Sequence, residues 1–498
     1  MSAYSDLEEK FRRLAILGDA TAMLHWDMAV MMPPGGAETR AEQLATLRVI
    51  HHDMLTDPAL ADLLDGAESD AAGLDGWQSA NLHEMRRQWI HANALDARLV
   101  EAFSKICSTT DMTWRAARPD SDFAAVRPQL EEMLGLVQEI AARKAEALGT
   151  TPYDALLDEY EPGGRAAEID RVFDDLAGFL PGFIDRVIDH QAAAGPPAPF
   201  AADIAEDKQR ALGHRIMEVI GFDFDHGRLD TSAHPFSSGA PDDLRITTRY
   251  SAADFTESLM GVIHETGHAL YEYQLPADWR HQPVGQSRGM ALHESQSLLM
   301  EMQACRSPEF IHFVAPLMRE VLGGQGPAWS DDNIQRHYRR VARSFIRVEA
   351  DEVTYPAHVI LRYRLERAMI AGDLAIADLP GAWNEAMAEM LGITPPDDRR
   401  GCLQDLHWYD GAWGYFPTYT LGAMIAAQLY AAADAADPDI RAGIARGDFK
   451  PLLAWLRANV HGHGSRLSTA EVVTAATGRP LDPQCFERHL EARYLAGG

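Results

Sequence analysis

Two histidines and a glutamate in the segment VIHETGHALYE, residues 262–272, have a spacing that suits a metal site. His264 and His268 are four residues apart, so on a helix their imidazoles project from one face, about one turn apart. Two imidazole nitrogens in this arrangement can reach a single zinc ion at ~2.0–2.1 Å each. Glu265 is rotated by about 100° from His264, where its carboxylate can take a proton from a zinc-activated water. The pattern therefore predicts metal-assisted hydrolysis.

The simpler alternative is a pair of helix-surface histidines that share a face by chance. The chain has 20 histidines among 498 residues. At that frequency an H-E-x-x-H pattern is expected about 0.05 times in such a chain. The motif therefore favours a zinc site, but a catalytic zinc needs a third protein ligand.

The helix that carries the histidines does not offer this third ligand. Glu272 lies four residues beyond His268, but its axial distance from His264 is about 12 Å, which is too long for one ion. The longer metzincin motif is also absent, because Tyr271 and Gln274 stand where glycine and histidine are needed. The ligand must come from another segment.

The best candidate segment is GMALHESQSLLMEMQ, residues 289–303, which contains Glu294. It follows the histidines after a loop and is predicted to form a second helix packed against the first. Two histidines and one glutamate, with a fourth position open to water, form a catalytic rather than a structural zinc site. His293 and Glu301 are rival ligands. His293 would point away if Glu294 faces the metal, and Glu301 lies two turns further along.

The elements that must position these residues are predicted to be mostly helices. Residues 123–148 and 166–188 show helical spacing, with abundant Ala, Leu, Glu and Arg. Strand-like alternation is limited to residues 228–236 and 243–250, separated by SSGAPD, whose composition suits a turn. We predict a β-hairpin there, followed by the histidine helix. The start of that helix is marked by a capping-box-like pattern of Ser251 and Asp254.

The chain is predicted to have two parts. The Pro/Ala-rich segment at residues 192–203 is the clearest connector. It separates an N-terminal helical part, residues 1–195, from residues 196–498, which hold the chemistry. One continuous domain, with this segment as a loop, is the alternative.

Composition excludes several classes of partner. Lys and Arg number 45 against 74 Asp and Glu, and the net charge of −29 repels phosphate backbones, so no nucleic-acid partner is expected. Four dispersed cysteines indicate reduced thiols in a cytoplasmic protein. Residues 411–433 carry no charge, but Pro417 and three glycines interrupt them, so a buried loop and an interior helix are expected rather than a membrane span. The N-terminus shows no signal peptide.

Several short motifs occur in an order that matches a known family. They are WDMAVMMPPGGAETRAEQLATL at residues 26–47, HPF at 234–236, DLRIT at 243–247, HETGH at 264–268, HESQS at 293–297, IRVEAD at 346–351 and GCLQDLHW at 401–408. Over nearly the whole chain the sequence resembles the thermostable (Taq-type) carboxypeptidases, zinc metallopeptidases with an HEXXH motif. One departure is MAVM at residues 28–31, where more polar residues would be expected.

This resemblance implies a mostly helical gluzincin-like fold with a deep substrate groove, one wall of which is the N-terminal part. It implies removal of single C-terminal amino acids from peptides with broad specificity, zinc in a site that often accepts cobalt, and a homodimer. Residue by residue, it implies His264, His268 and Glu294 as metal ligands and Glu265 as general base or acid.

The tetrahedral oxyanion of peptide hydrolysis needs a donor besides the metal. His407 in QDLHW and Tyr419 in FPTYTLG are the candidates, since related helical peptidases use a histidine or a tyrosine in this way. Each has a structural alternative: His407 as a core histidine bonded to a carbonyl, and Tyr419 as a buried phenol with one partner.

A carboxypeptidase must also hold the free carboxylate of its substrate. Arg347 in FIRVEADEVTY is the leading candidate, because a guanidinium pairs with a carboxylate through two parallel hydrogen bonds. Its alternative role is an internal salt bridge to Glu349 or Asp351. Gln296 and Ser297, beside Glu294, are expected to support that glutamate.

The predicted hairpin supplies two further candidates for substrate binding. Arg245 could hold the substrate carboxylate or instead lock the hairpin to Asp243. His234 either shapes the turn before Pro235 or contacts substrate. The edge strand could pair with an extended peptide.

Two other functions compete with the carboxypeptidase prediction. One is an endo-acting zinc oligopeptidase, with the same metal chemistry in a groove open at both ends. The other is a non-catalytic helical scaffold that only binds metal. The base Glu265 and a three-residue ligand set argue against the scaffold, and only the resemblance and the arginine anchor argue against the oligopeptidase.

Overall fold

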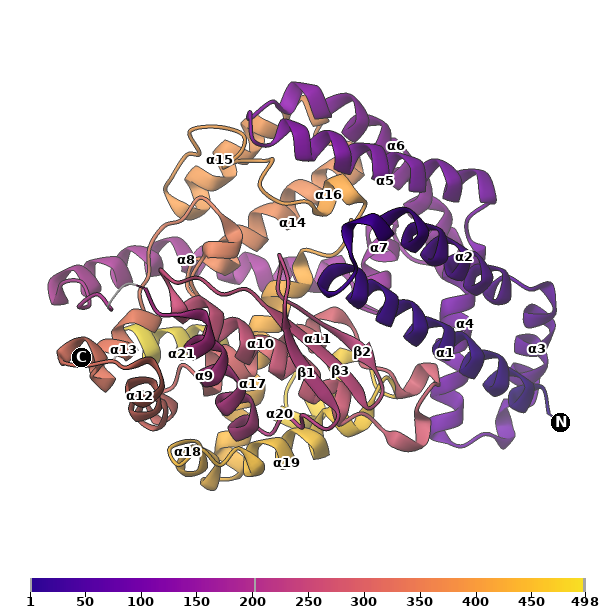
Figure 1. Cartoon of the computed structure of the whole chain (residues 1–498). Coiled ribbons are helices and arrows are strands. Elements are labelled where there is room, and N and C mark those ends of the chain that lie inside the picture. Colours follow the sequence, from indigo (N-terminus) through magenta and orange to yellow (C-terminus); the bar gives the residue numbers. More distant parts are fainter. Residues whose placement is uncertain (1, 201–202, 496–498) are drawn as a thin grey trace.

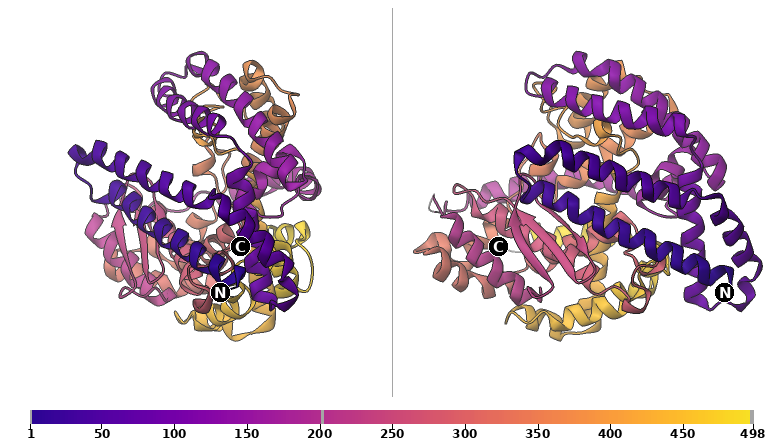
Figure 2. Two further views of the ribbon diagram at one scale, coloured as in Figure 1. Left: turned by 90° about the vertical axis from the view of Figure 1, so that its right-hand side faces the viewer. Right: turned by 45° about the vertical axis from the view of Figure 1, so that its right-hand side comes forward.

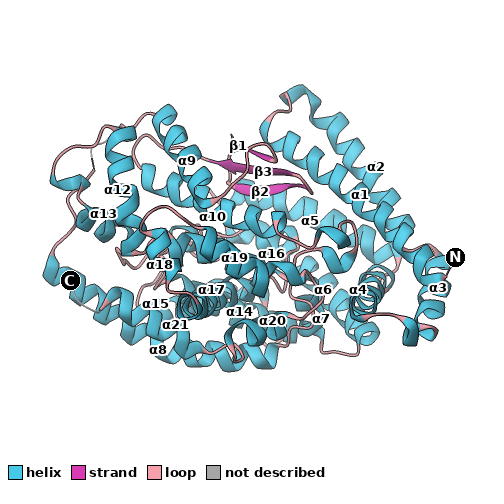
Figure 3. Cartoon of the chain, turned by 90° about the horizontal axis from the view of Figure 1, so that it is seen from below, coloured by secondary structure: helices cyan, strands magenta, loops and turns pink. Residues whose placement is uncertain are grey.

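The protein is mostly helical in a computed structural model, which describes residues 2–200 and 203–495 (Figures 1 and 3). The first helices are α1 (Ala3–Val30), α2 (Ala37–Leu55), α3 (Pro58–Ser69), α4 (Gly76–Asn93), α5 (Ala97–Ala117), α6 (Phe123–Leu148), α7 (Pro152–Tyr160), α8 (Ala166–Ala194) and α9 (Glu206–Ile220). The predicted helix at residues 123–148 is α6, and the one at 166–188 is the main part of α8.

Helix α6 illustrates why these segments are helical. Its buried side chains recur at three- and four-residue intervals, as at Val126, Leu130, Met133 and Val137, which forms one apolar stripe. The helix ends where Gly149 adopts a left-handed conformation with φ of 65°, which closes the last turn.

The later helices surround the segment that carries the motifs. They are α10 (Phe255–Tyr273), α11 (Met290–Leu298), the π-helix η5 (Leu299–Ala304), α12 (Pro308–Leu322), α13 (Asp331–Tyr338), α14 (Tyr355–Ala371), α15 (Leu379–Leu391), α16 (His407–Asp410), α17 (Pro417–Ala436), α18 (Asp439–Ile444), α19 (Lys450–Asn459), α20 (Thr469–Thr477) and α21 (Pro483–Tyr494). Single 3₁₀ turns are η1 (Pro34–Gly36), η2 (Ala71–Gly73), η3 (Ala277–Trp279), η4 (Pro283–Gly285), η6 (Pro327–Trp329), η7 (Arg347–Glu349), η8 (Ile376–Asp378) and η9 (His461–His463).

A small sheet lies directly before α10 in the chain, but its pairing differs from the predicted hairpin. Strands β1 (Gly227–Thr231), β2 (Phe236–Ala240) and β3 (Asp243–Thr248) lie in the order β1-β3-β2. β3 pairs antiparallel with β2 and parallel with β1. The prediction that residues 228–236 form the hairpin partner was wrong, because most of SSGAPD is strand β2. Backbone pairing with β3 overrides the low strand propensity of Ser and Gly.

The two faces of this sheet are covered by different helices. Leu229, Leu244 and Ile246 pack against Val262 and Ala269 of α10. On the other side, the guanidinium groups of Arg228 and Arg245 lie 5.2 and 4.3 Å from the ring centre of Trp26, on α1. The sheet therefore fixes α10 on one face and receives α1 on the other.

The N-terminal helices include two pairs, α1 with α2 and α5 with α6; α1 packs on β2, and α5 packs on α16. Figure 2 shows α1 with α2 and α5 with α6 as two arms that diverge in its left view. A small apolar core under α1, α3 and α4 is separate from the main core, which includes residues from Leu99 to Tyr494. The division into residues 1–195 and 196–498 stays a prediction, and part of its connector lies outside the described residues.

Helix α17 accounts for the uncharged segment at residues 411–433. The segment forms a loop followed by a largely buried helix, as predicted. Among the described residues, none of the helices combines the length and hydropathy that a membrane span requires.

Candidate active site

Helix α10 carries the HETGH motif with its two histidines one turn apart. The helix begins after Asp254, whose carboxylate accepts the backbone N–H of Thr256, so Asp254 is the cap and Ser251 is not. Val262 and Ile263 face the protein interior, and Glu265 is only 8% exposed. Ala269 and Leu270, which follow the motif, are buried as well, so apolar contacts anchor the helix on both sides of the motif.

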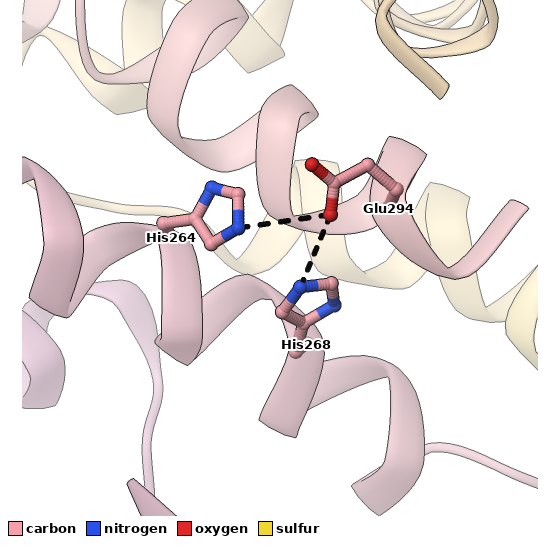
Figure 4. Close-up of side chains that lie close together, drawn as sticks. All are labelled: His264, His268 and Glu294. Atoms are coloured by element: carbon pink, nitrogen blue, oxygen red, sulfur yellow. Dashed lines mark ion pairs between the residues drawn. The ribbon is translucent and has the colours of Figure 1, made fainter. Parts of the chain in front are cut away.

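Helix α11 brings Glu294 to these histidines. Its Oε2 lies 3.7 Å from Nε2 of His264 and 3.4 Å from Nε2 of His268 (Figure 4). One ligand atom from each of the three side chains lies within 4.8 Å of the others. Ser297 donates a hydrogen bond to Oε2 of Glu294 at 3.2 Å, which supports the expected supporting role of that serine. The structure thus gathers the three predicted ligands at one point.

Glu301 contacts the opposite nitrogen of His264 rather than joining this cluster. Its Oε2 lies 3.0 Å from Nδ1 of His264, and its Oε1 accepts a hydrogen bond from Arg306 at 2.5 Å. It is carried by the π-helix η5, a departure from α-helical geometry of the kind that often marks functional sites. Carboxylates in this position orient metal-binding imidazoles.

His293, the other rival ligand, faces away from Glu294. Its Nε2 lies 2.9 Å from Oε1 of Glu272, which also accepts a hydrogen bond from Ser287 at 2.7 Å. The imidazole stacks on His268 with 4.5 Å between ring centres. His293 therefore supports the orientation of a candidate ligand without directing a nitrogen toward the same point.

The donor set suits a divalent cation. If Glu301 accepts a hydrogen bond from Nδ1–H of a neutral His264, the lone pair of Nε2 points toward Glu294. A lone pair opposite a carboxylate oxygen is unfavourable unless positive charge lies between them. Burial alone would lower the pKa of His264, but the carboxylates of Glu294 and Glu301 raise it to about 10, so the site demands a positive charge. Two nitrogens and one carboxylate match a catalytic ligand set.

Glu265 has a different environment from Glu294. Burial raises its pKa to about 7, and the neighbouring His264 opposes part of that rise. Burial also raises the carboxyl pKa of Glu294, but His264 and His268 outweigh it and hold the pKa below its usual value. The two carboxyls therefore differ in proton affinity, as a proton-transfer group and a charged ligand must.

His407 and Tyr419 lie together near this centre. Nε2 of His407 is 3.1 Å from the hydroxyl of Tyr419. Burial, with help from Arg347, lowers the pKa of His407 to about 4, so the imidazole is neutral. Tyr419 lies one turn before Gly422 on α17, and Gly422 adjoins Glu294. Nδ1 of His407 is buried without a hydrogen-bond partner among the described residues, so its predicted carbonyl bond is not seen.

Arg347 is buried beside this pair, and its internal partner is neither Glu349 nor Asp351. Its Nε and Nη2 donate to Oδ1 of Asp405 at 3.0 and 2.8 Å, and its Nη1 donates to the hydroxyl of Tyr355 at 2.8 Å. The guanidinium carbon lies 4.9 Å from the ring centre of Tyr419. The alternative of a local salt bridge is therefore wrong in its partner, because Arg347 pairs with Asp405, 58 residues along the chain.

The two candidates from the sheet lie elsewhere. Arg245 pairs with Asp243 through two hydrogen bonds of 2.7 Å and stacks on Trp26, so it is engaged in holding the sheet to α1. His234 is exposed in the loop between β1 and β2, and its carbonyl accepts a hydrogen bond from Ser232 at 2.6 Å. The contacts seen for both are structural.

Sequence reasoning missed three residues that organise the site. Asp405 pairs with Arg347, and Arg306 pairs with Glu301. His461 is buried between Gln274 and Gln296, with 2.9 and 2.8 Å from its ring nitrogens to their side-chain oxygens. Asp405 had a signal, since it stands in QDLHW beside His407, whereas Arg306 and His461 lie in no motif.

The protein is helical, and it gathers two histidines and a carboxylate beside a buried glutamate. This combination of fold and site is typical of a metallopeptidase. The model of the carboxypeptidase Taq (M32) metallopeptidases matches residues 6–494. The chain is 37% identical to thermostable carboxypeptidase 1 of Thermus thermophilus over 99% of each chain, and 33% identical to carboxypeptidase 1 of Bacillus subtilis over 97% and 96%.

Solved structures agree with these relatives. Metallocarboxypeptidase 1 of Trypanosoma cruzi superposes with a TM-score of 0.97 at 40% identity, over 99% of each chain. The M32 carboxypeptidase of Deinococcus radiodurans gives 0.93 at 37% identity, over 99% of this chain and 98% of the other. The chain therefore belongs to the M32 family, as its motifs indicated, and it is a metallocarboxypeptidase, a peptide hydrolase that requires a divalent metal.

Proposed function

We propose that the chain is a zinc carboxypeptidase that releases single C-terminal amino acids from peptides with broad specificity. The observation that carries this proposal is the convergence of His264, His268 and Glu294, with Glu265 buried beside them. The family resemblance implies zinc, in a site that often accepts cobalt. These three side chains would hold a divalent ion, which would supply polarisation of the scissile carbonyl and a lower pKa for a water molecule.

Glu265 is the proposed proton-transfer group. It adjoins His264 in sequence and is rotated by about 100° from it on the helix, which places its carboxylate beside the candidate ligands, where it can take a proton from the attacking water. It accepts a proton from that water and later delivers the proton to the leaving amine. A pKa of about 7, raised by burial, is suited to a group that must act as base and then as acid near neutral pH.

His407 and Tyr419 are the proposed donors to the developing oxyanion. Their 3.1 Å contact holds the two side chains in one orientation. When Nε2–H of His407 donates to the hydroxyl oxygen of Tyr419, the tyrosine O–H remains to donate to the oxyanion. Donors that are already in position need not reorient when the oxyanion forms. In a site shielded from water they stabilise its negative charge more than they would in solvent.

Arg347 is the proposed anchor for the substrate carboxylate. Asp405 takes its Nε–Nη2 edge and Tyr355 takes one Nη1 proton, so one N–H on each terminal nitrogen remains for a ligand. Arg245 is the weaker candidate because Asp243 already occupies its fork. His234 and the β2 edge stay candidates for contact with the peptide backbone.

The finer molecular setting is also a proposal. We place the substrate in a groove between an N-terminal helical part, residues 1–195, and the remainder of the chain, in a cytoplasmic homodimer. Sedimentation equilibrium would test the dimer, with twice the monomer mass expected and the monomer mass counting against it.

The test of the function combines one substitution with two substrates. Glu265→Gln is expected to lower kcat by ~10²–10⁴-fold, because a positioned acid–base group contributes about that much, while the zinc content of the purified protein stays equal to wild type. The exposed Glu257→Gln on the same helix is the matched control and is expected to keep full activity.

The second comparison uses a peptide and its C-terminally amidated twin. Wild type is expected to cleave only the free acid, since the amide cannot pair with the Arg347 fork. Equal cleavage of both peptides would favour the endo-acting oligopeptidase. Unaltered turnover by Glu265→Gln would reject the mechanism, and bound zinc without any hydrolysis would favour the scaffold.

A further inference from the structure

Helix α11, which carries Glu294, contacts both α10 and α17. The three helices lie near the centre of the molecule (Figure 1). Each neighbour approaches α11 through a glycine. On α10 this is Gly267, between the two candidate histidine ligands. A Cβ added there would lie 2.6 Å from the carbonyl oxygen of Gln296 and 2.7 Å from Cα of Ser297. These are backbone atoms, so any side chain at 267 would push the whole of α11 away from the histidines.

Gly422 on α17 meets α11 from the other side. A Cβ added at this position would lie 2.9 Å from both Cβ and Cγ of Glu294, and 3.1 Å from the carbonyl oxygen of Ala291. Carbon atoms in contact normally lie ~3.5–4.0 Å apart. The stem of the glutamate therefore occupies the space that a side chain at 422 would need.

The backbone of α17 does not itself require glycine at this position. Gly422 is absent from the residues with positive φ, so its conformation is open to any amino acid. Glycine in the middle of a helix is less stable than alanine, and the surrounding sequence is rich in alanine. The local preference for alanine is thus overridden by a tertiary contact, and that contact is with Glu294.

A third constraint acts on α11 from behind. His461 lies between Gln274, at the end of α10, and Gln296, two residues after Glu294. It is 1% exposed, so it links the two helices inside the core. Gly267 and His461 therefore fix the distance between α10 and α11. Gly422 on α17 then limits where the stem of Glu294 can lie.

We propose that Gly422 is a positioning residue that fixes where the carboxylate of Glu294 meets His264 and His268. It has no side chain that could bind substrate or metal, and it acts through its close contact with the Glu294 stem and the adjoining backbone of α11. The inference rests on the proposed function, since it assumes that these three side chains hold the metal.

The test is Gly422→Ala, measured by metal affinity rather than activity. The dissociation constant for Zn²⁺, obtained by competition with a chromophoric chelator, is expected to rise ~10–100-fold, the usual effect of losing support for a ligand. The visible spectrum of the Co²⁺-loaded protein is expected to change, because it reports coordination geometry. The melting temperature of the metal-free protein is expected to fall only slightly, because the added methyl group overpacks one contact between α17 and α11 without removing any core side chain.

The matched control is Gly135→Ala in the middle of α6, where an added Cβ meets nothing within 4 Å. This control is expected to keep the wild-type zinc affinity. Wild-type zinc affinity in Gly422→Ala would overturn the proposal, and so would collapse of the metal-free variant, which would make Gly422 a packing residue of the whole fold.

A second comparison separates this inference from the proposed function. His264→Ala should lose zinc binding if the predicted site is the metal site. If it keeps the wild-type affinity, the proposed function fails together with the inference. If it loses zinc while Gly422→Ala binds like wild type, only the inference fails.

Discussion

At the scale of single residues, the site depends on side chains that contact the candidate ligands and orient them but are not ligands themselves. Glu301 holds Nδ1 of His264 and is itself held by Arg306, so a short charged chain orients one imidazole. Burial alone would raise the pKa of Glu301, but Arg306 and His264 outweigh it and hold the pKa below its usual value. A charged carboxylate at this position makes Nδ1 the protonated nitrogen and leaves Nε2 free to bind a metal.

Glu301→Gln is therefore expected to weaken Zn²⁺ binding by ~10–100-fold. The amide removes the charge that selects the tautomer of His264, although it keeps the volume of the side chain. Chelator competition measures the affinity, and Glu320→Gln, which removes an exposed acid on α12, is the control. Equal affinities for both variants would contradict the role of Glu301.

At the scale of elements, one buried carboxyl connects three segments around His407. Glu366 on α14 accepts hydrogen bonds from Tyr153 on α7 at 2.7 Å, Trp408 on α16 at 2.7 Å and the backbone of Gly414 at 3.0 Å. No cation is among these partners, so burial dominates and raises its pKa from 4.5 to about 7. The helix that begins with His407 is thus held by a group that changes charge near neutral pH.

This shift gives stability a specific pH dependence. The native protein binds the Glu366 proton more tightly than the unfolded chain does, so the free energy of unfolding falls as pH rises from about 4.5 to 7. Glu366→Gln removes that titration. The stability advantage of wild type over this variant is expected to shrink by up to ~3 kcal/mol between pH 5 and pH 8.

Urea unfolding of both proteins across this pH range measures the effect. The comparison is internal, because every other titrating group is common to the two proteins. A difference between wild type and variant that stays constant with pH would show that the carboxyl of Glu366 has the same pKa in the native and the unfolded protein.

At the scale of the whole molecule, buried charges join the N-terminal helices to the segment that leads into α11. Glu84 on α4 accepts hydrogen bonds from Arg288 at 2.5 Å and Arg87 at 2.9 Å, and Arg87 continues to Asp158 on α7 at 3.2 Å. Arg288 lies directly before α11 and is 6% exposed. Ions buried in this way are expensive to leave unpaired.

Glu84→Gln is expected to lower the free energy of unfolding by ~3–5 kcal/mol, because it leaves the buried guanidinium of Arg288 without a carboxylate and leaves Arg87 with Asp158 alone. Chemical denaturation measures the loss. The control is Glu131→Gln on α6, whose salt bridge to Arg127 is half exposed, and it is expected to change stability by less than ~1 kcal/mol. If both variants lose a similar amount of unfolding free energy, the buried ion pairs of Glu84 stabilise the fold no more than an exposed salt bridge does.

What the sequence determined by itself was local. The periodicity that predicts α6 and α8 acts within a few residues, and so does the spacing that places His264 and His268 on one face. Family motifs added the fold class and the metallocarboxypeptidase activity, and they named Glu294 as the partner of the two histidines. The local features can be predicted from sequence because the regular geometry of a helix fixes which residues share a face.

The tertiary structure decided the contacts between distant segments. It paired Arg347 with Asp405 rather than with its neighbours in the chain, inserted β3 between β1 and β2, and set Gly422 against Glu294. A sequence gives only the order of side chains along the chain. Salt bridges, strand order and close packing depend on which elements contact one another in the folded protein. Propensity predicts the elements, and the packing of their faces selects the partners.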